Sequence, residues 1–372
     1  MRFDPEQEEL RRTVRTLLER AAGGDVWRLL AEQVGALGLA IPEEYGGAGF
    51  SVLETHVVLE ELGAALAVPG FLSTTLAAQA ILAGDSAEAK AELLPGIAEG
   101  ETRAAVAWGG AVQASADGGG WRLTGAANHV WDGGEADLFV VPAQMPNQAS
   151  PAPEPDARAR LAQESGARAG LAQASDAGSS RIGLFVVASR DAAVTTVETV
   201  DPGRPQARVE FRASPAISLG ADPALPDRVL DLACVAISAE QVGAAQRAFD
   251  LTLAYAKQRV QFGRPIGSFQ AVKHRLADLF TLLESARSAS YAAAFAAVSG
   301  PELTVAASRA KAYCSEAFTT IAGEAIQLHG GIGITWEHPI HLYFKRAHAT
   351  SQLFGSPAWH RRRYARAIGL AA

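Results

Sequence analysis

Gln258-Arg-Val-Gln-Phe-Gly-Arg-Pro-Ile-Gly-Ser-Phe-Gln-Ala271 is the stretch that decides the fold of this chain. It ends one helical segment and starts another, because its glycines and Pro265 stop the first helix and Ser268 can cap the second. We expect the turn to present Arg259 and Arg264 beside free helix N-terminal amides, which suits a phosphate group. An ordinary corner between two helices explains the same residues without a ligand.

Helical periodicity continues on both sides of this turn, from Pro226 to the end of the chain. Three apolar stripes follow the helical repeat: Val242, Ala245, Phe249, Leu253 and Ala256; Leu276, Leu279, Leu283 and Ala286; and Ala306, Ala310, Tyr313, Ala317, Ile321, Ala325 and Leu328. Long helices with small residues on their apolar faces pack closely. Residues 219–372 are therefore predicted to form a C-terminal four-helix bundle.

Two further domains are expected before the bundle, which makes the chain an α+β protein. Residues 1–103 are predicted to be helical, with Asp4 as an N-cap and Pro5 in the first helical position. Residues 104–218 contain short runs rich in Val, Phe and Trp between glycines, which predicts a central β domain.

The stretch 143–180 interrupts the β domain and contains a tandem ten-residue duplication, 157–166 and 167–176. It has too few large apolar groups to offset its ordering entropy, so we expect a mobile insertion on a strand connection. A segment that binds a partner protein is the alternative interpretation.

Composition limits the classes of partner and the cellular compartments that we expect for this chain. The chain has 372 residues, 48% of them hydrophobic, and a formal net charge of −7, so a nucleic-acid partner is not expected. Its two cysteines, Cys234 and Cys314, lie in apolar helical patterns, which predicts buried thiols in a reducing compartment. The charged N-terminus lacks the apolar core of a signal peptide, and no uncharged 18-residue apolar run follows. We expect a cytoplasmic protein without a membrane span.

A second unusual segment, Gln327-Leu-His-Gly-Gly-Ile-Gly333, ends the third apolar stripe. Its three glycines allow the backbone to approach a ligand closely, and Gln327 and His329 add polar reach. His338, His341 and His348 follow, but they mix loop and helix positions without a carboxylate-rich site. We therefore expect no metal site.

Together these segments resemble the signature motifs of the acyl-CoA dehydrogenase family. Residues 259–271 resemble R-x-Q-F-G-x-P-I-x-x-F-Q-A, and residues 327–333 resemble Q-x-x-G-G-x-G. A third motif is similar to Leu37-Gly-Leu-Ala-Ile-Pro-Glu-Glu-Tyr-Gly-Gly-Ala-Gly49, followed by Leu59-Glu-Glu-Leu-Gly63. The three resemblances span most of the chain in family order.

The resemblance implies the acyl-CoA dehydrogenase fold, with FAD held across a dimer interface. In the family, the two C-terminal motifs reach the flavin of a neighbouring subunit, its pyrophosphate through the first motif and its adenosine end through the start of the next helix. The implied cofactor-binding residues are Arg259, Gln261, Phe262, Phe269, Gln270, Gln327, Leu328, His329, Gly330 and Gly331.

The chain departs from the family at the catalytic base. The family removes the α-proton of an acyl-CoA thioester with a Glu, but the usual Glu position falls on Phe354, and the alternative position in the first bundle helix falls on Ala233. We therefore assign no catalytic residue. Asp231 matches an acid that the family often carries on the substrate side, although an exposed helix position is the simpler interpretation.

Contacts to the chain's own flavin are also missing. The family's hydroxyl-bearing loop corresponds to residues 107–115, which lack that run, and its tryptophan segment has become Val130-Trp131-Asp132-Gly133. Trp131 either stacks on a ligand ring or belongs to the core. Contacts that would serve a neighbour's flavin are intact.

This asymmetry resembles the base-less subunit of actinobacterial heterotetrameric acyl-CoA dehydrogenases that act on steroid side chains. The resemblance implies an α2β2 assembly with a catalytic subunit, an acyl-CoA substrate and an electron-acceptor flavoprotein. Two alternatives remain: a self-sufficient homomeric flavoenzyme with another base such as Glu240, and a structural subunit that touches neither FAD nor CoA. The cationic run 360–363 with Arg366 is either a contact for CoA phosphates or a solvated last helical turn.

Overall fold

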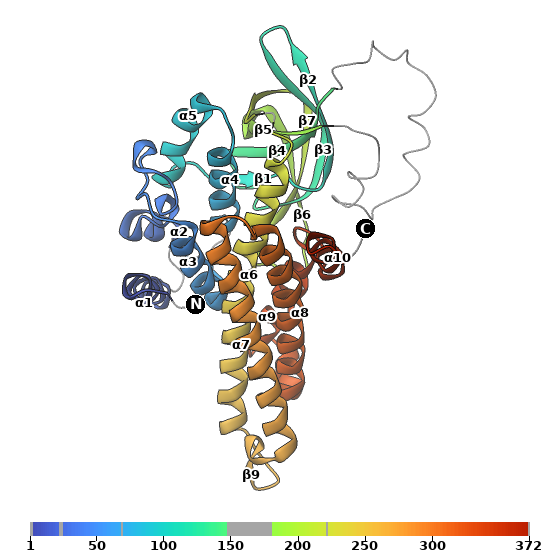
Figure 1. Cartoon of the computed structure of the whole chain (residues 1–372). Coiled ribbons are helices and arrows are strands. Elements are labelled where there is room, and N and C mark those ends of the chain that lie inside the picture. The colour runs from blue at the N-terminus through green and yellow to red at the C-terminus, as the bar shows by residue number, and fades with distance from the viewer. Residues whose placement is uncertain (1–2, 22–24, 68–69, 147–180, 221, 371–372) are drawn as a thin grey trace.

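The computed structural model describes residues 3–21, 25–67, 70–146, 181–220 and 222–370. Figure 1 shows a β domain above a long helical bundle, with the N-terminal helices beside both. The predicted α+β class and the order of helical, β and helical parts are confirmed. The boundaries at 103/104 and 218/219 stay a prediction.

The N-terminal part contains α1 (Pro5–Arg20), α2 (Val26–Leu29), α3 (Val52–Ala65), α4 (Phe71–Ala83) and α5 (Ala87–Ala98). The prediction for the start of α1 is confirmed, because the Asp4 carboxylate accepts a hydrogen bond of 2.8 Å from the backbone N–H of Gln7. Gln7 returns a bond from its side-chain oxygen to the Asp4 N–H, which completes a capping box.

The strands of the β domain are β1 (Ala104–Val106), β2 (Gly110–Asp117), β3 (Gly120–Trp131), β4 (Leu138–Gln144), β5 (Ile182–Ala188), β6 (Ala192–Val197) and β7 (Gln206–Ser218). Their order is β1-β4-β2-β3-β7-β5, and pairing of β4 with β5 closes the sheet around an apolar core. The expected start of the insertion at 143 is wrong. Ala143 is buried and pairs with Gly183, so β4 continues through Gln144. Residues 147–180 lie outside the described residues.

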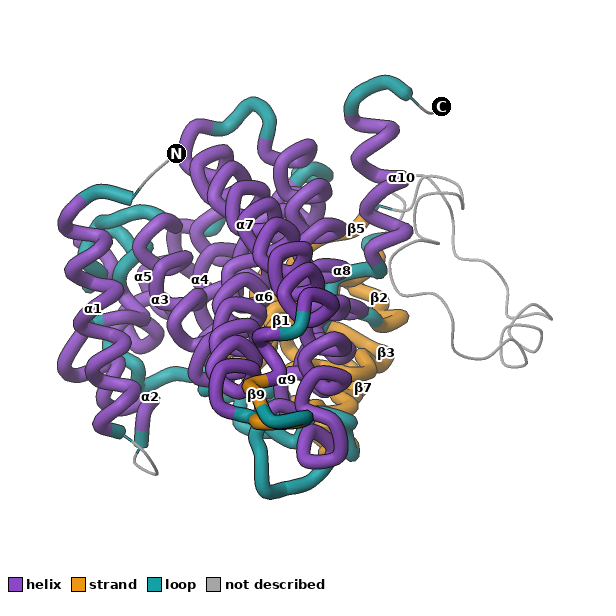
Figure 2. The backbone as a smooth tube through the Cα atoms, turned by 90° about the horizontal axis from the view of Figure 1, so that it is seen from below, coloured by secondary structure: helices purple, strands orange, loops and turns teal. Residues whose placement is uncertain are grey.

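The C-terminal part consists of α6 (Leu225–Gln258), α7 (Gln270–Ser299), α8 (Leu303–His329), α9 (Ile340–Gln352) and α10 (Pro357–Ala367). Seen from below in Figure 2, the long helices α6, α7 and α8 lie side by side with α9. The predicted stripes form the core, with one error: Tyr313 is 38% exposed, because it faces outward from α8. Cys234 and Cys314 are buried free thiols, as predicted.

Two glycines bring α3 against α6. A Cβ atom on Gly243 would lie 1.8 Å from the carbonyl oxygen of Glu60, and one on Gly63 would lie 2.1 Å from that of Glu240. The two helix backbones therefore touch where a side chain cannot fit. This contact holds α6 against α3, and it therefore positions the rest of α6 relative to the N-terminal helices.

Candidate functional site

A short hairpin extends from the end of the bundle. Its strands are β8 (Val260–Gln261) and β9 (Arg264–Pro265), and Phe262 and Gly263 form the turn with φ of 53° and 78°. Two positive φ values fit a two-residue type I′ hairpin turn. Phe262 is 92% exposed at the tip, and its ring meets the Phe269 ring edge-on with centroids 6.2 Å apart. An aromatic side chain in this position suits contact with another molecule.

The hairpin leads directly into α7. Arg264 stacks over the Phe269 ring at 4.2 Å, while Arg259, Gln261 and Gln270 are exposed. The prediction that Ser268 caps α7 is wrong, because the extended residue Phe269 takes the N-cap position and no side chain accepts a capping bond there. The first helix also ends earlier than the glycines suggested, at Gln258.

The glycine-rich segment lies at the same end of the bundle. Gly330 has a φ of 63°, and a Cβ atom on Gly330 or Gly331 would meet nothing within 4 Å, so the backbone there is open to a ligand. Gln327 is exposed, whereas Leu328 packs partly into the bundle core. The His329 ring does not point outward: it is 3% exposed, and its Nδ1–H donates to the Ala325 carbonyl oxygen at 2.7 Å.

Tyr255, which was not among the predicted site residues, connects the two motifs. Its hydroxyl donates to the His329 carbonyl oxygen at 3.3 Å, and its ring stacks on the His329 ring with centroids 4.4 Å apart. The His338 ring packs on the His329 ring, with centroids 4.4 Å apart. Tyr255 lies four residues before Arg259, and residues four apart share a helix face. This spacing could have identified Tyr255 as a site residue from the sequence.

A groove of about 770 Å³ runs beside the hairpin between the end of α6 and the start of α7. Its walls include Leu253, Leu276 and Pro265, and its rim carries Lys257 and Lys273. With Arg259 and Arg264 nearby, this end of the bundle presents four cationic side chains to solvent. The arrangement suits an extended ligand with apolar and anionic parts.

Neither family base position can accept a proton. Ala233 is fully buried, and Phe354 is 8% exposed with a φ of 59°. Phe354 lines a small niche with Trp108, Trp131 and His129, and the niche has only about 20 Å³ of free space. Since ligand pockets generally measure ~300–1,000 Å³, this niche fits the reactive part of a cofactor poorly. Trp131 is buried, with the Arg204 guanidinium 5.4 Å from its ring centroid, which favours the core interpretation.

Two buried side chains donate hydrogen bonds to backbone carbonyl oxygens in and just before the loop that carries Phe354. His360 donates from Nε2 to the Phe354 carbonyl oxygen at 2.8 Å, and Lys311 donates to the Ser351 carbonyl oxygen at 3.0 Å. Burial lowers the pKa of His360 to about 3 and that of Lys311 to about 8, and it raises the pKa of Cys234 to about 12. None of these groups substitutes for a carboxylate facing a ligand.

His360 is expected to make the fold acid-sensitive. Because its pKa is lowered from 6.5 to about 3 in the folded chain, the unfolded chain binds more protons below pH 6.5. Stability present above pH 6.5 is therefore lost as the pH falls toward 3. Between pH 7.5 and 5 the loss is about 2 kcal/mol. His360→Gln keeps an Nε2 donor for Phe354 but cannot titrate, so denaturant unfolding of this variant should show a pH dependence smaller by that amount. Equal slopes would contradict the assignment.

The expectation that Asp231 is exposed is wrong. Its carboxylate is 2% exposed, forms an ion pair with Arg363 and accepts a bond of 2.6 Å from the Thr304 hydroxyl. The cationic run is likewise only partly solvated, because His360 is buried and Arg363 is paired. A helix carboxylate becomes buried when a cation from another helix neutralises it, which sequence spacing does not reveal.

Glu240 also lies inside an ion cluster. It is fully buried and pairs with Arg204 and Arg346, which in turn contact Asp132 and Asp201. Burial alone would raise the pKa of Glu240, but the two guanidinium groups outweigh it and lower that pKa. Glu240 is therefore neither accessible to a substrate nor a good proton acceptor, which argues against the alternative in which it serves as the base.

Among the described residues there is no group of three or more His, Cys, Asp or Glu side chains suited to a metal ion. In the same part of the chain, none of the helices has the length and apolar character needed to cross a membrane.

Known proteins with the same organisation identify the family. Residues 4–101 match the acyl-CoA dehydrogenase N-terminal domain and residues 226–369 match its C-terminal domain. Acyl-CoA dehydrogenase IpdE2 of Mycobacterium tuberculosis is 38% identical, over 95% of this chain and 94% of its own length.

Solved structures agree with this likeness. A Tcur3481-Tcur3483 steroid acyl-CoA dehydrogenase variant has a TM-score of 0.83 and 31% identity, covering 98% of this chain and 97% of that one. The ChsE4-ChsE5 complex from M. tuberculosis has a TM-score of 0.85 and 28% identity, covering 100% and 99%. The chain belongs to the acyl-CoA dehydrogenase family.

Proposed function

We propose that this chain is the base-less subunit of an FAD-dependent acyl-CoA dehydrogenase, in which it completes the flavin site of a catalytic partner. One observation carries the proposal. The two base positions hold the buried apolar residues Phe354 and Ala233, whereas the hairpin and Gln327 are exposed at the end of the bundle. The chain therefore offers contacts to another subunit and lacks the acid–base group of its own.

Bound FAD would supply a hydride acceptor for the β-position of the acyl-CoA thioester, and the partner would supply the carboxylate that removes the α-proton. This chain's residues would bind and orient the cofactor. Arg259 and Gln261 would hold the pyrophosphate, Phe269 and Gln270 would contact the adenosine end, and Phe262 at the hairpin tip would add an aromatic contact. Gln327 would add a side-chain amide, Gly330 and Gly331 would offer open backbone, and Leu328 and His329 would support this segment from the core side.

Two similar structures support the partner and the substrate that we propose. The ChsE4-ChsE5 structure is named as a complex. The Tcur3481-Tcur3483 structure is named as a steroid acyl-CoA dehydrogenase. We assign this chain to an α2β2 heterotetramer that dehydrogenates the CoA thioester of a steroid side chain in the cytoplasm and passes electrons to an acceptor flavoprotein. The closed niche at Phe354 supports the view that catalysis uses the partner's pocket.

Co-expression tests the proposal. The chain is produced alone and together with an acyl-CoA dehydrogenase subunit encoded beside it that carries the family Glu. Bound FAD and acyl-CoA oxidation are then measured. We expect FAD and turnover in the complex, and turnover lower by at least ~10²–10⁴-fold in the chain alone, the usual effect of losing a catalytic base. Full flavin loading and turnover by the lone chain would refute the proposed role.

A further inference from the structure

Three aromatic rings pack together beside the glycine-rich segment at the end of the bundle. The His329 ring contacts the rings of Tyr255 on α6 and His338 before α9, each with centroids 4.4 Å apart, and we call these three residues the ring cluster. The Tyr255 hydroxyl also donates to the His329 carbonyl oxygen, and the next residue, Gly330, has a positive φ. The ring cluster therefore holds the backbone that leads into residues 330–333.

Hydrogen bonds determine which nitrogen of each histidine carries a proton. The Nδ1 atom of His329 lies 2.7 Å from the Ala325 carbonyl oxygen, which is an acceptor, so this Nδ1 carries a hydrogen. The Nδ1 atom of His338 lies 3.2 Å from the backbone nitrogen of Ile340, which is a donor, so this Nδ1 carries none. Ile340 begins α9, where the N–H groups have no partner within the helix. The bond to Ile340 therefore requires a neutral His338 ring.

A second proton on either ring would disturb this arrangement. The Nε2 atom of His329 is buried and has no hydrogen-bond partner in the described chain. A proton there would bury a charge and an N–H group without an acceptor, which is costly. A proton on Nδ1 of His338 would break the bond to Ile340. Burial lowers the pKa of both histidines, and a neighbouring ring lowers each further, His338 for His329 and His341 for His338.

The titratable and charged groups around the ring cluster do not neutralise such a charge. Tyr255 faces it from α6, and His341 and Lys345 lie on α9, where Lys345 lowers the pKa of His341. On α8, Glu324 pairs with an arginine of α7, and Glu337 is exposed in the loop before α9. Protonation would therefore place a positive charge beside further cationic groups, and the structure favours the neutral rings.

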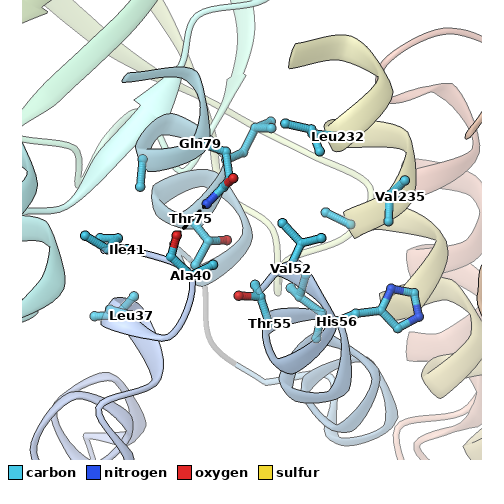
Figure 3. Close-up of a pocket in the computed structure, with 14 residues that line it drawn as sticks. Leu37, Ala40, Ile41, Val52, Thr55, His56, Thr75, Gln79, Leu232 and Val235 are labelled. Carbon is cyan, nitrogen blue, oxygen red and sulfur yellow. Dashed lines mark hydrogen bonds between the residues drawn. The ribbon is translucent and has the colours of Figure 1, made fainter. Parts of the chain in front are cut away.

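Two other buried histidines do not titrate in the same pH range. Burial lowers the pKa of both His56 and His360 to about 3, so both stay neutral in the folded chain at pH 5. His56 borders the aliphatic pocket between α3, α4 and α6, and Figure 3 shows its ring directed toward α6, away from the bundle end. Neither histidine touches the ring cluster in the described contacts.

We propose that His329 and His338 form a proton-sensitive support of the glycine-rich segment, which holds residues 330–333 in place only while both rings are neutral. In an opened segment each ring regains the ordinary histidine pKa of about 6.5. The opened segment therefore binds more protons, and the closed arrangement that is stable above pH 6.5 loses stability as the pH falls below that value. If the proposed flavin role holds, on which this consequence rests, acid weakens the chain's hold on the cofactor.

Hydrogen exchange of the full chain, without FAD or partner, tests the support itself. Mass spectrometry follows the peptide 326–340 at pH 7.5 and 5, corrected for the intrinsic pH dependence of exchange. We expect the corrected rate to rise about tenfold or more on acidification. His338→Asn keeps an oxygen acceptor for the Ile340 N–H but cannot titrate, so the logarithm of this rise should be about halved. His348→Gln, at an exposed position on α9, is the control and should behave as the wild type does. An equal rise in His338→Asn, or no rise in the wild type, would overturn the proposal.

The consequence for flavin is measured in the co-expressed complex, as the dissociation constant of FAD at the same two pH values. It should rise by roughly three- to tenfold in the wild type on acidification, and by less in His338→Asn. Equal weakening in both proteins would assign the pH dependence to the partner subunit and contradict the link to the ring cluster. A complex that holds no FAD at pH 7.5 would instead contradict the proposed function, and hydrogen exchange of the chain alone would still decide whether the histidines support the segment.

Discussion

Replacing Glu240 by Gln is expected to lower the free energy of unfolding by about 3–5 kcal/mol, because it leaves two buried guanidinium groups without their shared counter-ion. Glu240 contacts Arg204 through one carboxylate oxygen and Arg346 through the other, at 3.0 Å for Arg346. All three side chains are at most 2% exposed. Solvent therefore cannot replace the lost charge. Denaturant unfolding followed by fluorescence measures the effect.

An exposed ion pair in the same bundle provides the control. Glu316 on α8 pairs with Arg361 on α10, with side chains 41% and 60% exposed. Water and salt screen such a pair, so Glu316→Gln should change stability by less than ~1 kcal/mol. If Glu240→Gln and Glu316→Gln have similar small effects, the buried cluster around Glu240 does not stabilise the fold as expected.

The Glu240 result also bears on the reaction. If Glu240 were the base of a self-sufficient enzyme, Glu240→Gln would lower turnover in protein that remains folded. In the proposed heteromer, turnover per folded molecule is unchanged and the amount of folded protein falls. Measuring both quantities on the same samples separates a role in chemistry from a role in holding α6 and α9 against the β domain.

The sequence predicted the elements whose signals are local. The N-cap at Asp4, the helical stripes on α6 and the buried thiols depend on residues within a few turns of one another, and the structure contains them. The glycine-rich segment and the turn between the two helices were identified for the same reason, because positive φ and close backbone approach leave glycines in the sequence. The two short strands of the hairpin were not predicted.

The errors concern side chains whose environment is assembled from distant segments. Asp231 was expected to be exposed, but its partner Arg363 lies 132 positions away in the chain. The His329 ring turns inward because Tyr255 and His338 stack on it, and Tyr313 turns outward because none of the described elements fully covers it on α8. Periodicity gives the face of a helix, but it does not identify what packs there.

Replacing Arg259 and Gln327 together by Ala is expected to strip FAD from the co-expressed complex. Both side chains are exposed at one end of the bundle, on segments that Tyr255 ties together. Arg259 would lose a charge-assisted contact to the pyrophosphate, worth about 1.5–3 kcal/mol, and Gln327 a neutral one of about 1 kcal/mol. The sum corresponds to roughly a 100-fold weaker hold on the flavin. Flavin absorbance per complex after gel filtration, and turnover with and without added FAD, measure it.

Arg212→Ala on β7 is the matched control, because Arg212 is an exposed arginine whose partner, Glu210, lies within its own strand. It should leave flavin content unchanged. The double variant should still form the complex, since neither side chain supports the core, and added FAD should restore part of its turnover. If the double variant keeps its full flavin content, the chain is a structural subunit that does not touch the cofactor. In that case the exposed hairpin, with Phe262 at its tip, would contact partner protein alone.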